Sequence, residues 1–173
     1  MCDCNWVCYL IYSLDSNDTY IGSSNNQPKR LDAHNNNNKE IKRVGAKRTR
    51  GQTWIPIIVI KGFHHKCACL SFEAGWKRLA KLRNNQRLKF INMMADSNLC
   101  YTGCTKWNRL MDLLYFVHNF TLLDTKFRLN YDMRHPLNQP DELIINIFFE
   151  NWIKNLPWPH FIKTKIKKLD KIQ

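Results

Sequence analysis

Five side chains in the first half of the sequence have the chemistry needed to cleave a phosphodiester bond: Tyr9, Tyr20, Arg30, His34 and Glu73. An arginine binds phosphate oxygens through a two-pronged fork and keeps its charge at any ordinary pH. A single carboxylate is enough for one Mg²⁺, because this ion keeps most of its waters. A tyrosine acts as general base only where positive charge lowers its pKa from about 10. Together these side chains predict a hydrolytic site for nucleic acid.

Each residue also has an ordinary structural interpretation. The two tyrosines could be plain strand residues, Arg30 a solvated helix residue, and His34 a cap or packing residue of its own helix. Glu73 and Lys77 could form an exposed i,i+4 pair, which stabilises a helix by only about 0.3–0.5 kcal/mol. The functional interpretation therefore depends on the five residues occurring together.

The segments that carry these residues have a simple order. Val7–Ser13 is β-branched and aromatic, and a turn cluster separates it from a partner strand ending at Gly22. A helix is expected from Pro28 until the asparagine run at 35–38. A strong strand follows at Trp54–Gly62, in which Pro56 indicates an early or edge position. Apolar residues at helical spacing then predict a helix over Lys66–Leu82.

The second half of the chain is expected to be helical. An apolar stripe from Trp107 to Val117 predicts an amphipathic helix, and a second helix is expected over Asp141–Lys154. The last thirteen residues have a weak helical pattern and many lysines. We therefore expect an α/β (α+β) fold with a catalytic domain over residues 1–85 and a helical extension over 86–173.

The charge of the chain indicates a polyanionic partner. Lys and Arg number 27 against 14 Asp and Glu, which gives a formal net charge of +13. No apolar run is long enough to predict a membrane span, and the N-terminal residues do not resemble a signal peptide. A basic loop over residues 39–50 and the start of the first helix supply the expected DNA contacts: Lys29, Lys39, Lys42, Arg43, Lys47, Arg48 and Arg50.

The seven cysteines do not follow a regular metal-binding or disulfide pattern. In a reducing compartment they are expected to be small buried side chains, with no structural zinc. Zinc bound through Cys100 and Cys104, or through the N-terminal cysteines, is the alternative.

The order β-β-α-β-α, with Tyr9, Tyr20-Ile21-Gly22, Arg30, His34 and Glu73 at matching intervals, resembles the GIY-YIG endonuclease superfamily. Val7-Cys8-Tyr9 stands where Gly-Ile-Tyr is usual. YLIY, YIG, KRLDAHN, GAKRTRGQTW and FEAGW make the chain more similar to the SLX-type structure-specific branch, over roughly residues 7–80. The RING-type zinc domain of that branch is not recognisable in the sequence.

This resemblance implies a small three-stranded antiparallel sheet flanked by helices, and one Mg²⁺ or Mn²⁺ ion on Glu73. It favours Tyr9 as general base and leaves Tyr20 to position water or phosphate. It also implies cleavage of branched double-stranded DNA, such as flaps and junctions, in repair, recombination or replication. A scaffold protein or a second copy of the chain could bind the C-terminal region, and no membrane partner is expected.

Three other functions remain open at this point. The chain could be an inactive GIY-YIG-fold DNA-binding or scaffold module, a sequence-specific nicking endonuclease, or a protein that binds RNA or an acidic membrane. Nineteen asparagines with many Lys and Ile suggest an A/T-rich genome, as in a large DNA virus. A nuclear or cytoplasmic location, at a viral replication site, is the corresponding expectation.

Overall fold

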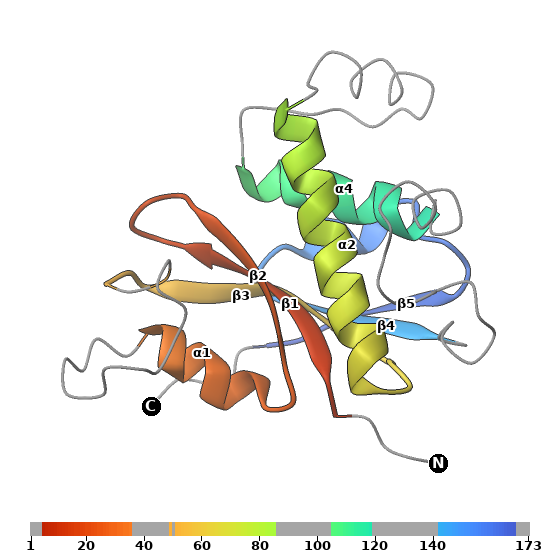
Figure 1. The fold of residues 1–173 in the computed structure, drawn as a ribbon, viewed down its shortest axis with the longest axis horizontal. Coiled ribbons are helices and arrows are strands. Elements are labelled where there is room, and N and C mark those ends of the chain that lie inside the picture. The colour runs from red at the N-terminus through yellow and green to blue at the C-terminus, as the bar shows by residue number, and fades with distance from the viewer. Residues whose placement is uncertain (1–4, 36–48, 50, 86–104, 119–141, 169–173) are drawn as a thin grey trace.

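A computed structural model describes residues 5–35, 49, 51–85, 105–118 and 142–168 (Figure 1). Five strands form one sheet in the order β2-β1-β3-β4-β5. Three α-helices and a short 3₁₀-helix complete the described part. The elements are β1 (Val7–Ser13), β2 (Thr19–Ser24), α1 (Gln27–Asn35), β3 (Trp54–Lys61), α2 (Lys66–Asn85), α4 (Thr105–His118), β4 (Leu143–Ile147), η2 (Asn151–Asn155) and β5 (Ile162–Ile166).

Strands β2, β1 and β3 form the predicted antiparallel core of the sheet. Tyr9 of β1 lies opposite Gly22 on one side and Val59 on the other. The turn between β1 and β2 passes through Asn17, whose φ of 57° is one that asparagine tolerates well. The predicted α/β class and the predicted hairpin are therefore confirmed.

The sheet separates two hydrophobic clusters. On one face, Cys8 and Leu10 of β1 pack with Phe72 and Trp76 of α2 and with residues of α4. On the other face, Val7, Tyr9 and Ile11 pack with Leu31 of α1 and Trp54 of β3. This alternation along β1 follows from the two-residue period of a strand. The same strand thus contributes to the larger core with its even-numbered residues and to the α1 side with its odd-numbered residues.

Strand β3 lies in the interior of the sheet. Pro56 is its third residue, opposite Ile11, where the register with β1 shifts between Leu10 and Ile11. The pairing of β3 with β4 begins only at Ile58. Pro56 therefore removes no N–H from the β3–β4 ladder, which confirms the early position that the sequence predicts.

The C-terminal part differs from the prediction. The helix expected over Asp141–Lys154 is wrong, because this segment contains β4 and the 3₁₀-helix η2. The weak helix expected at the end of the chain is also wrong, because β5 pairs there in parallel with β4. The sheet consequently has five strands instead of three. The predicted helix over 107–117 is confirmed by α4, while the domain boundary at 85 stays a prediction.

Three further expectations concern composition. Cys8 and Cys69 are buried as expected and Cys67 is exposed, whereas the other four cysteines lie outside the described residues. The basic loop also lies outside them, except for Thr49. No helix in the described ranges has the length and apolar character needed to cross a membrane.

Candidate active site

The candidate site lies at strand β2, the outermost strand on one side of the described sheet. Helices α1 and α2 both pack against this strand, from opposite faces. Tyr20 belongs to β2, and its ring is 5.1 Å from the ring of His34 on α1. The ammonium of Lys77 on α2 lies 5.4 Å from the centre of the same ring. Tyr20 therefore marks the place where side chains from both helices meet.

Asn26 and Asn35 fix the helix that carries Arg30 and His34. The Asn26 side chain accepts a hydrogen bond from the backbone N–H of Lys29, which is the usual role of an N-cap residue. At the other end, the Asn35 amide bonds to both the N–H and the C=O of Trp54, at 2.6 and 3.0 Å. Helix α1 is thereby tied to the start of β3.

A buried chain of hydrogen bonds begins at Tyr9. Its hydroxyl is 3.0 Å from His34 Nε2, and His34 Nδ1 is 2.7 Å from the hydroxyl of Thr49. Tyr9 and His34 are each 1% exposed, and Thr49 is fully buried. Trp54 donates from its indole N–H to the Thr49 carbonyl at 2.8 Å, which holds this residue in place. Tyr9 thus faces a histidine whose orientation is fixed by a third group.

Burial and Arg30 set the protonation of this chain. Burial raises the pKa of Tyr9 well above its usual value, although a hydrogen bond and the positive charge of Arg30 partly offset this rise. Burial and the same positive charge lower the pKa of His34 to about 4. Burial alone would lower the pKa of Arg30, but hydrogen bonds from Arg30 to Tyr9 and Tyr20 raise it. At neutral pH the site therefore holds a phenol, a neutral imidazole and a guanidinium.

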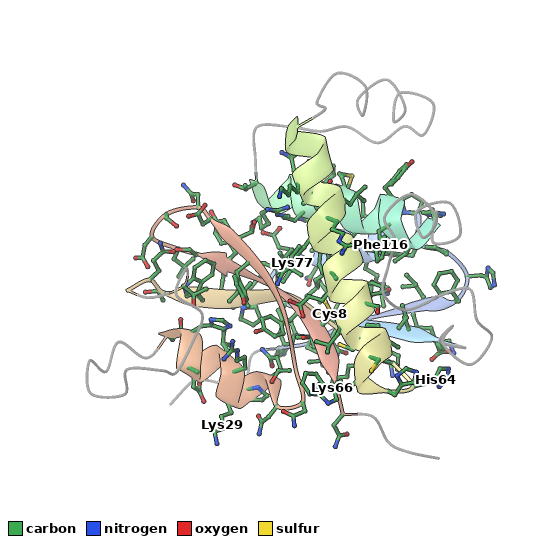
Figure 2. All side chains as sticks on the ribbon, in the orientation of Figure 1. Cys8, Lys29, His64, Lys66, Lys77 and Phe116 are labelled. Atoms are coloured by element: carbon green, nitrogen blue, oxygen red, sulfur yellow. The ribbon has the colours of Figure 1, made fainter. Side chains whose placement is uncertain are left out.

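Glu73 reaches the same strand from the α2 side. One carboxylate oxygen accepts a hydrogen bond of 2.5 Å from the Ser23 hydroxyl on β2, and the other pairs with Lys77. Figure 2 shows Lys77 on the side of α2 that faces the β1–β2 hairpin. The Glu73 side chain is 15% exposed, so it is shielded but still reachable from solvent. Its carboxylate and the Tyr20 ring thus share one cation, Lys77.

Gly22 makes the close packing of the two tyrosines possible. A Cβ at this position would lie 2.5 Å from the Tyr9 hydroxyl and 2.9 Å from a ring carbon of Tyr20. Any side chain larger than hydrogen would push the Tyr9 hydroxyl from its place.

Comparison with known proteins agrees with this geometry. Residues 5–87 match the GIY-YIG catalytic domain family. The chain belongs to the GIY-YIG family. It is 59% identical over 166 residues to L300, an uncharacterized protein of Acanthamoeba polyphaga mimivirus, covering 96% of this chain and 99% of that one.

Other GIY-YIG relatives are fungal subunits named SLX1, structure-specific endonuclease subunits. The Schizosaccharomyces pombe protein is 34% identical over 136 residues, covering 62% of this chain and 49% of the relative. The Kluyveromyces lactis protein is 39% identical over 87 residues, covering 46% of this chain and 29% of the relative. The chain thus spans about half or less of these SLX1 subunits.

The five residues predicted to act together lie at this one edge of the GIY-YIG domain. Tyr9, Arg30 and His34 cluster on the α1 side, Glu73 approaches from α2, and Tyr20 lies between them. Lys29, predicted to bind DNA, is exposed on α1 and points into solvent (Figure 2). The other six predicted DNA-binding residues lie outside the described part of the chain: Lys39, Lys42, Arg43, Lys47, Arg48 and Arg50.

Three residues of the site were not predicted to take part: Ser23, Thr49 and Lys77. Thr49 lies within GAKRTRG, a motif in which only Lys47, Arg48 and Arg50 are predicted to contact DNA. Lys77 was noticed only as a helix neighbour of Glu73, and Ser23 directly follows Tyr20-Ile21-Gly22. In each case the sequence signal was present, but the partner lies far away along the chain.

The residues at the edge fit one divalent cation of the Mg²⁺ type. In the described ranges no three Asp, Glu, His or Cys side chains gather into a metal-binding group. A single shielded carboxylate is nevertheless what Mg²⁺ commonly uses when substrate phosphate and waters complete its shell. Lys77 is 43% exposed at its side chain, so it can turn away when a cation takes its place beside Glu73.

Proposed function

We propose that this chain is a metal-dependent endonuclease that hydrolyses phosphodiester bonds at branched DNA, such as flaps and junctions. The observation that carries the proposal is the meeting of Tyr9, Tyr20, Arg30, His34 and Glu73 at one edge of a GIY-YIG domain. An inactive DNA-binding module of the same fold would need neither the Tyr9–His34 hydrogen bond nor a shielded carboxylate at the same edge of the sheet. The intact set therefore favours an active nuclease.

Arg30 and Glu73 stabilise the negative charge of the phosphate during the reaction. Arg30 binds the oxygens of the scissile phosphate, and its fork fits two of them at once. Glu73 holds one Mg²⁺ or Mn²⁺ ion, which neutralises charge that develops on the phosphoryl group. Tyr20 lies between the two and orients the phosphate or the attacking water through its hydroxyl.

Tyr9 and His34 transfer the proton that leaves the attacking water. Because burial raises the pKa of Tyr9, its hydroxyl is not ionised to a phenolate at neutral pH. It can, however, receive a proton from water while passing its own proton to a neutral imidazole. His34 is such an imidazole: with its Nδ1–H donated to Thr49, its Nε2 lone pair accepts the Tyr9 proton. The low pKa of His34 keeps this lone pair available at neutral pH.

The choice of substrate and setting rests on charge and on relatives. The net charge of +13 suits a polyanion, and the SLX1 relatives are named as structure-specific endonuclease subunits. The word subunit supports a partner protein for this chain as well, in the form of a scaffold protein or a second copy. The mimivirus relative supports a viral setting. We infer that the chain acts there during DNA replication, recombination or repair.

Replacing Glu73 by glutamine tests the proposal most directly. Glu73→Gln keeps the size of the side chain but removes the charge that a hard cation requires. Cleavage of 5′-flap and four-way-junction DNA should fall by orders of magnitude, while binding to these substrates persists. Glu150→Gln is the matched control, because Glu150 is also shielded and paired with a lysine, Lys106, but lies far along the chain from the site. Its cleavage rate should equal that of wild type.

Four outcomes, measured on branched and linear DNA with Mg²⁺ or EDTA, would count against the proposal. Wild-type cleavage in EDTA, or full activity of Glu73→Gln, would exclude the metal role. Equal cutting of linear and branched DNA at fixed base sequences would favour a sequence-specific nicking enzyme. Absence of cleavage on every branched substrate, with candidate partners added, would leave an inactive DNA-binding module.

A further inference from the structure

The C-terminal strands give the sheet a second functional face. Paired residues share a face, so the register from β1 to β5 places Val59, Lys61, Asn146 and Lys165 on the face opposite α2 and α4. The neighbouring residues Ile58, Ile60, Ile145 and Ile147 point into the larger core. On this face Val59 and Asn146 are buried, while Lys61, Lys163 and Lys165 are exposed, and the other face bears isoleucines.

A groove of about 430 Å³ lies on this face, between the start of α1 and the end of β5. Its lining includes Lys61, Lys167 and Lys168, five side-chain amides and the ring of Phe148. None of the described residues that line it is a carboxylate. A groove of ammonium and amide donors matches the oxygens of a phosphate backbone.

The charge around the groove has one sign. Lys61, Lys165, Lys167 and Lys168 are exposed, and we call these four residues the lysine face. Glu142, just before β4, pairs with Lys163 on the same face, so this pair adds no net charge and leaves the four lysines unneutralised. Four exposed like charges side by side attract a polyanion, and counterions are released when the polyanion binds them.

The groove is continuous with the candidate active site. Val7 lines the groove and is two residues before Tyr9 on the same face of β1. Asn26 lines it too, and its carbonyl accepts the backbone N–H of Arg30, one turn along α1. A nucleic acid strand that leaves the phosphate-binding arginine can therefore pass directly over the start of α1 onto the lysine face.

We propose that the lysine face binds the phosphate backbone of a second arm of branched DNA while the scissile bond lies at Glu73. The inference rests on the proposed function, because it assigns a place to the arm that is not cut. The path from β2 to β5 crosses four strand spacings, or about 19 Å. At 3.4 Å per nucleotide of one strand, this length corresponds to roughly six nucleotides.

The test compares two pairs of lysine substitutions in the Glu73→Gln background, in which DNA is bound but not cut. Lys61→Gln with Lys167→Gln removes two charges from the lysine face. Lys81→Gln with Lys154→Gln removes two exposed charges from α2 and η2 and serves as control. Affinity for a four-way junction is measured against salt concentration for both pairs.

We expect the lysine-face pair to lower the slope of log affinity against log salt by about 0.9 for each phosphate that the protein no longer neutralises. Extrapolated from 1 M salt, this slope corresponds to roughly eightfold weaker binding per phosphate near 0.1 M salt. The control pair should keep the wild-type slope. Shortening the uncut arm below about six base pairs should weaken binding by the protein that keeps its lysines. The same shortening should not change the affinity of the Lys61→Gln, Lys167→Gln protein.

The outcomes separate this inference from the proposed nuclease function. A wild-type slope in the lysine-face pair, or equal losses in both pairs, would overturn the inference even if the enzyme cuts junctions. A lower slope only in the lysine-face pair would support it even if no cleavage were found, because binding alone is measured. Arm-length dependence that survives in the lysine-face pair would place the second arm elsewhere and overturn the inference as well.

Discussion

At the scale of single residues, burial decides which groups of the site carry protons. Tyr9 and His34 are equally buried, yet burial acts on them in opposite directions, because it disfavours the anion of one and the cation of the other. Both groups are thereby held neutral over a wide range of pH. In the resting state this neutral donor and neutral acceptor, 3.0 Å apart, form no buried charge pair. Tyr9 stays neutral during proton transfer to His34 only if it takes up a proton from water in the same step.

The low pKa of His34 predicts how stability depends on pH. Its pKa falls from 6.5 to about 4 on folding, so the unfolded chain binds more protons between these values. Above pH 6.5 His34 is neutral in both the folded and the unfolded chain, and the free energy of unfolding is at its full value. As pH falls toward 4, the unfolded chain binds a proton at His34 that the folded chain does not, so the free energy of unfolding falls. At pH 5 the loss should be about 2 kcal/mol of unfolding free energy.

Denaturant unfolding of wild type and His34→Gln at pH 7 and pH 5 measures this loss. The carboxylates affect both proteins alike, so the wild type should lose more stability than the variant on acidification. The same loss in both proteins would show that His34 is protonated as easily in the folded as in the unfolded chain.

A substitution at Gly22 should reduce DNA cleavage more than it reduces the stability of the fold. The Cβ of Gly22→Ala would meet the Tyr9 hydroxyl and the Tyr20 ring, and such overpacking costs about 1–3 kcal/mol. Gly75→Ala is the matched control, because its Cβ would press on the ring of Phe116 inside the core. Both variants should melt at lower temperature, but only Gly22→Ala should lose cleavage of flap DNA. Normal cleavage by Gly22→Ala would mean that Tyr9 can move without loss of function.

At the scale of elements, the sequence predicts the first half of the fold and fails at the last two strands. Strands β1 and β3 have β-branched and aromatic runs between turn residues, and α2 and α4 have long apolar stripes. By contrast, LIINI in β4 is a short apolar run, which fits a helix and a strand equally well. IKTKI in β5 has three polar residues in succession between its two isoleucines, a pattern typical of a solvated tail.

The site was predictable to a similar extent. Tyr9, Tyr20, Arg30, His34 and Glu73 stand at intervals typical of a known family, so their convergence could be expected. The contact between His34 and Thr49 joins residues 15 positions apart in the sequence, and no local pattern encodes it. Ser23 joins Glu73 for the same reason, since their contact spans 50 positions of sequence.

We expect the GIY-YIG domain to fold poorly without the C-terminal elements α4, β4 and β5. A chain ending at residue 104 would lose α4 and β4, which cover Phe72, Trp76 and the outer edge of β3. Trp76 would also lose the backbone carbonyl of Arg109 as acceptor for its indole N–H. Size-exclusion chromatography and thermal unfolding should show aggregation and no cooperative transition, whereas a chain ending at residue 168 should behave as full length. Cooperative melting of the shorter chain at the full-length temperature would contradict this expectation.

At the scale of the whole molecule, positive charge exceeds negative charge by 13. Exposed lysines include Lys29 on α1 and the lysine face of the sheet, and also Lys77 and Lys81 on α2. A molecule with this net charge should attract DNA from a distance, and high salt should weaken that attraction.

The position of β3 between β1 and β4 has a consequence for the timing of synthesis. β3 ends at Lys61, but its second neighbour is complete only at Ile147. At about 5–20 residues per second, a ribosome takes roughly 4–17 s to make the 86 residues in between. During these seconds the backbone of Ile58–Lys61 has no strand on one side and can pair with another nascent chain. The last third of the chain, although remote from Tyr9 and Glu73, therefore decides when a newly made molecule is protected from its neighbours on the same messenger RNA.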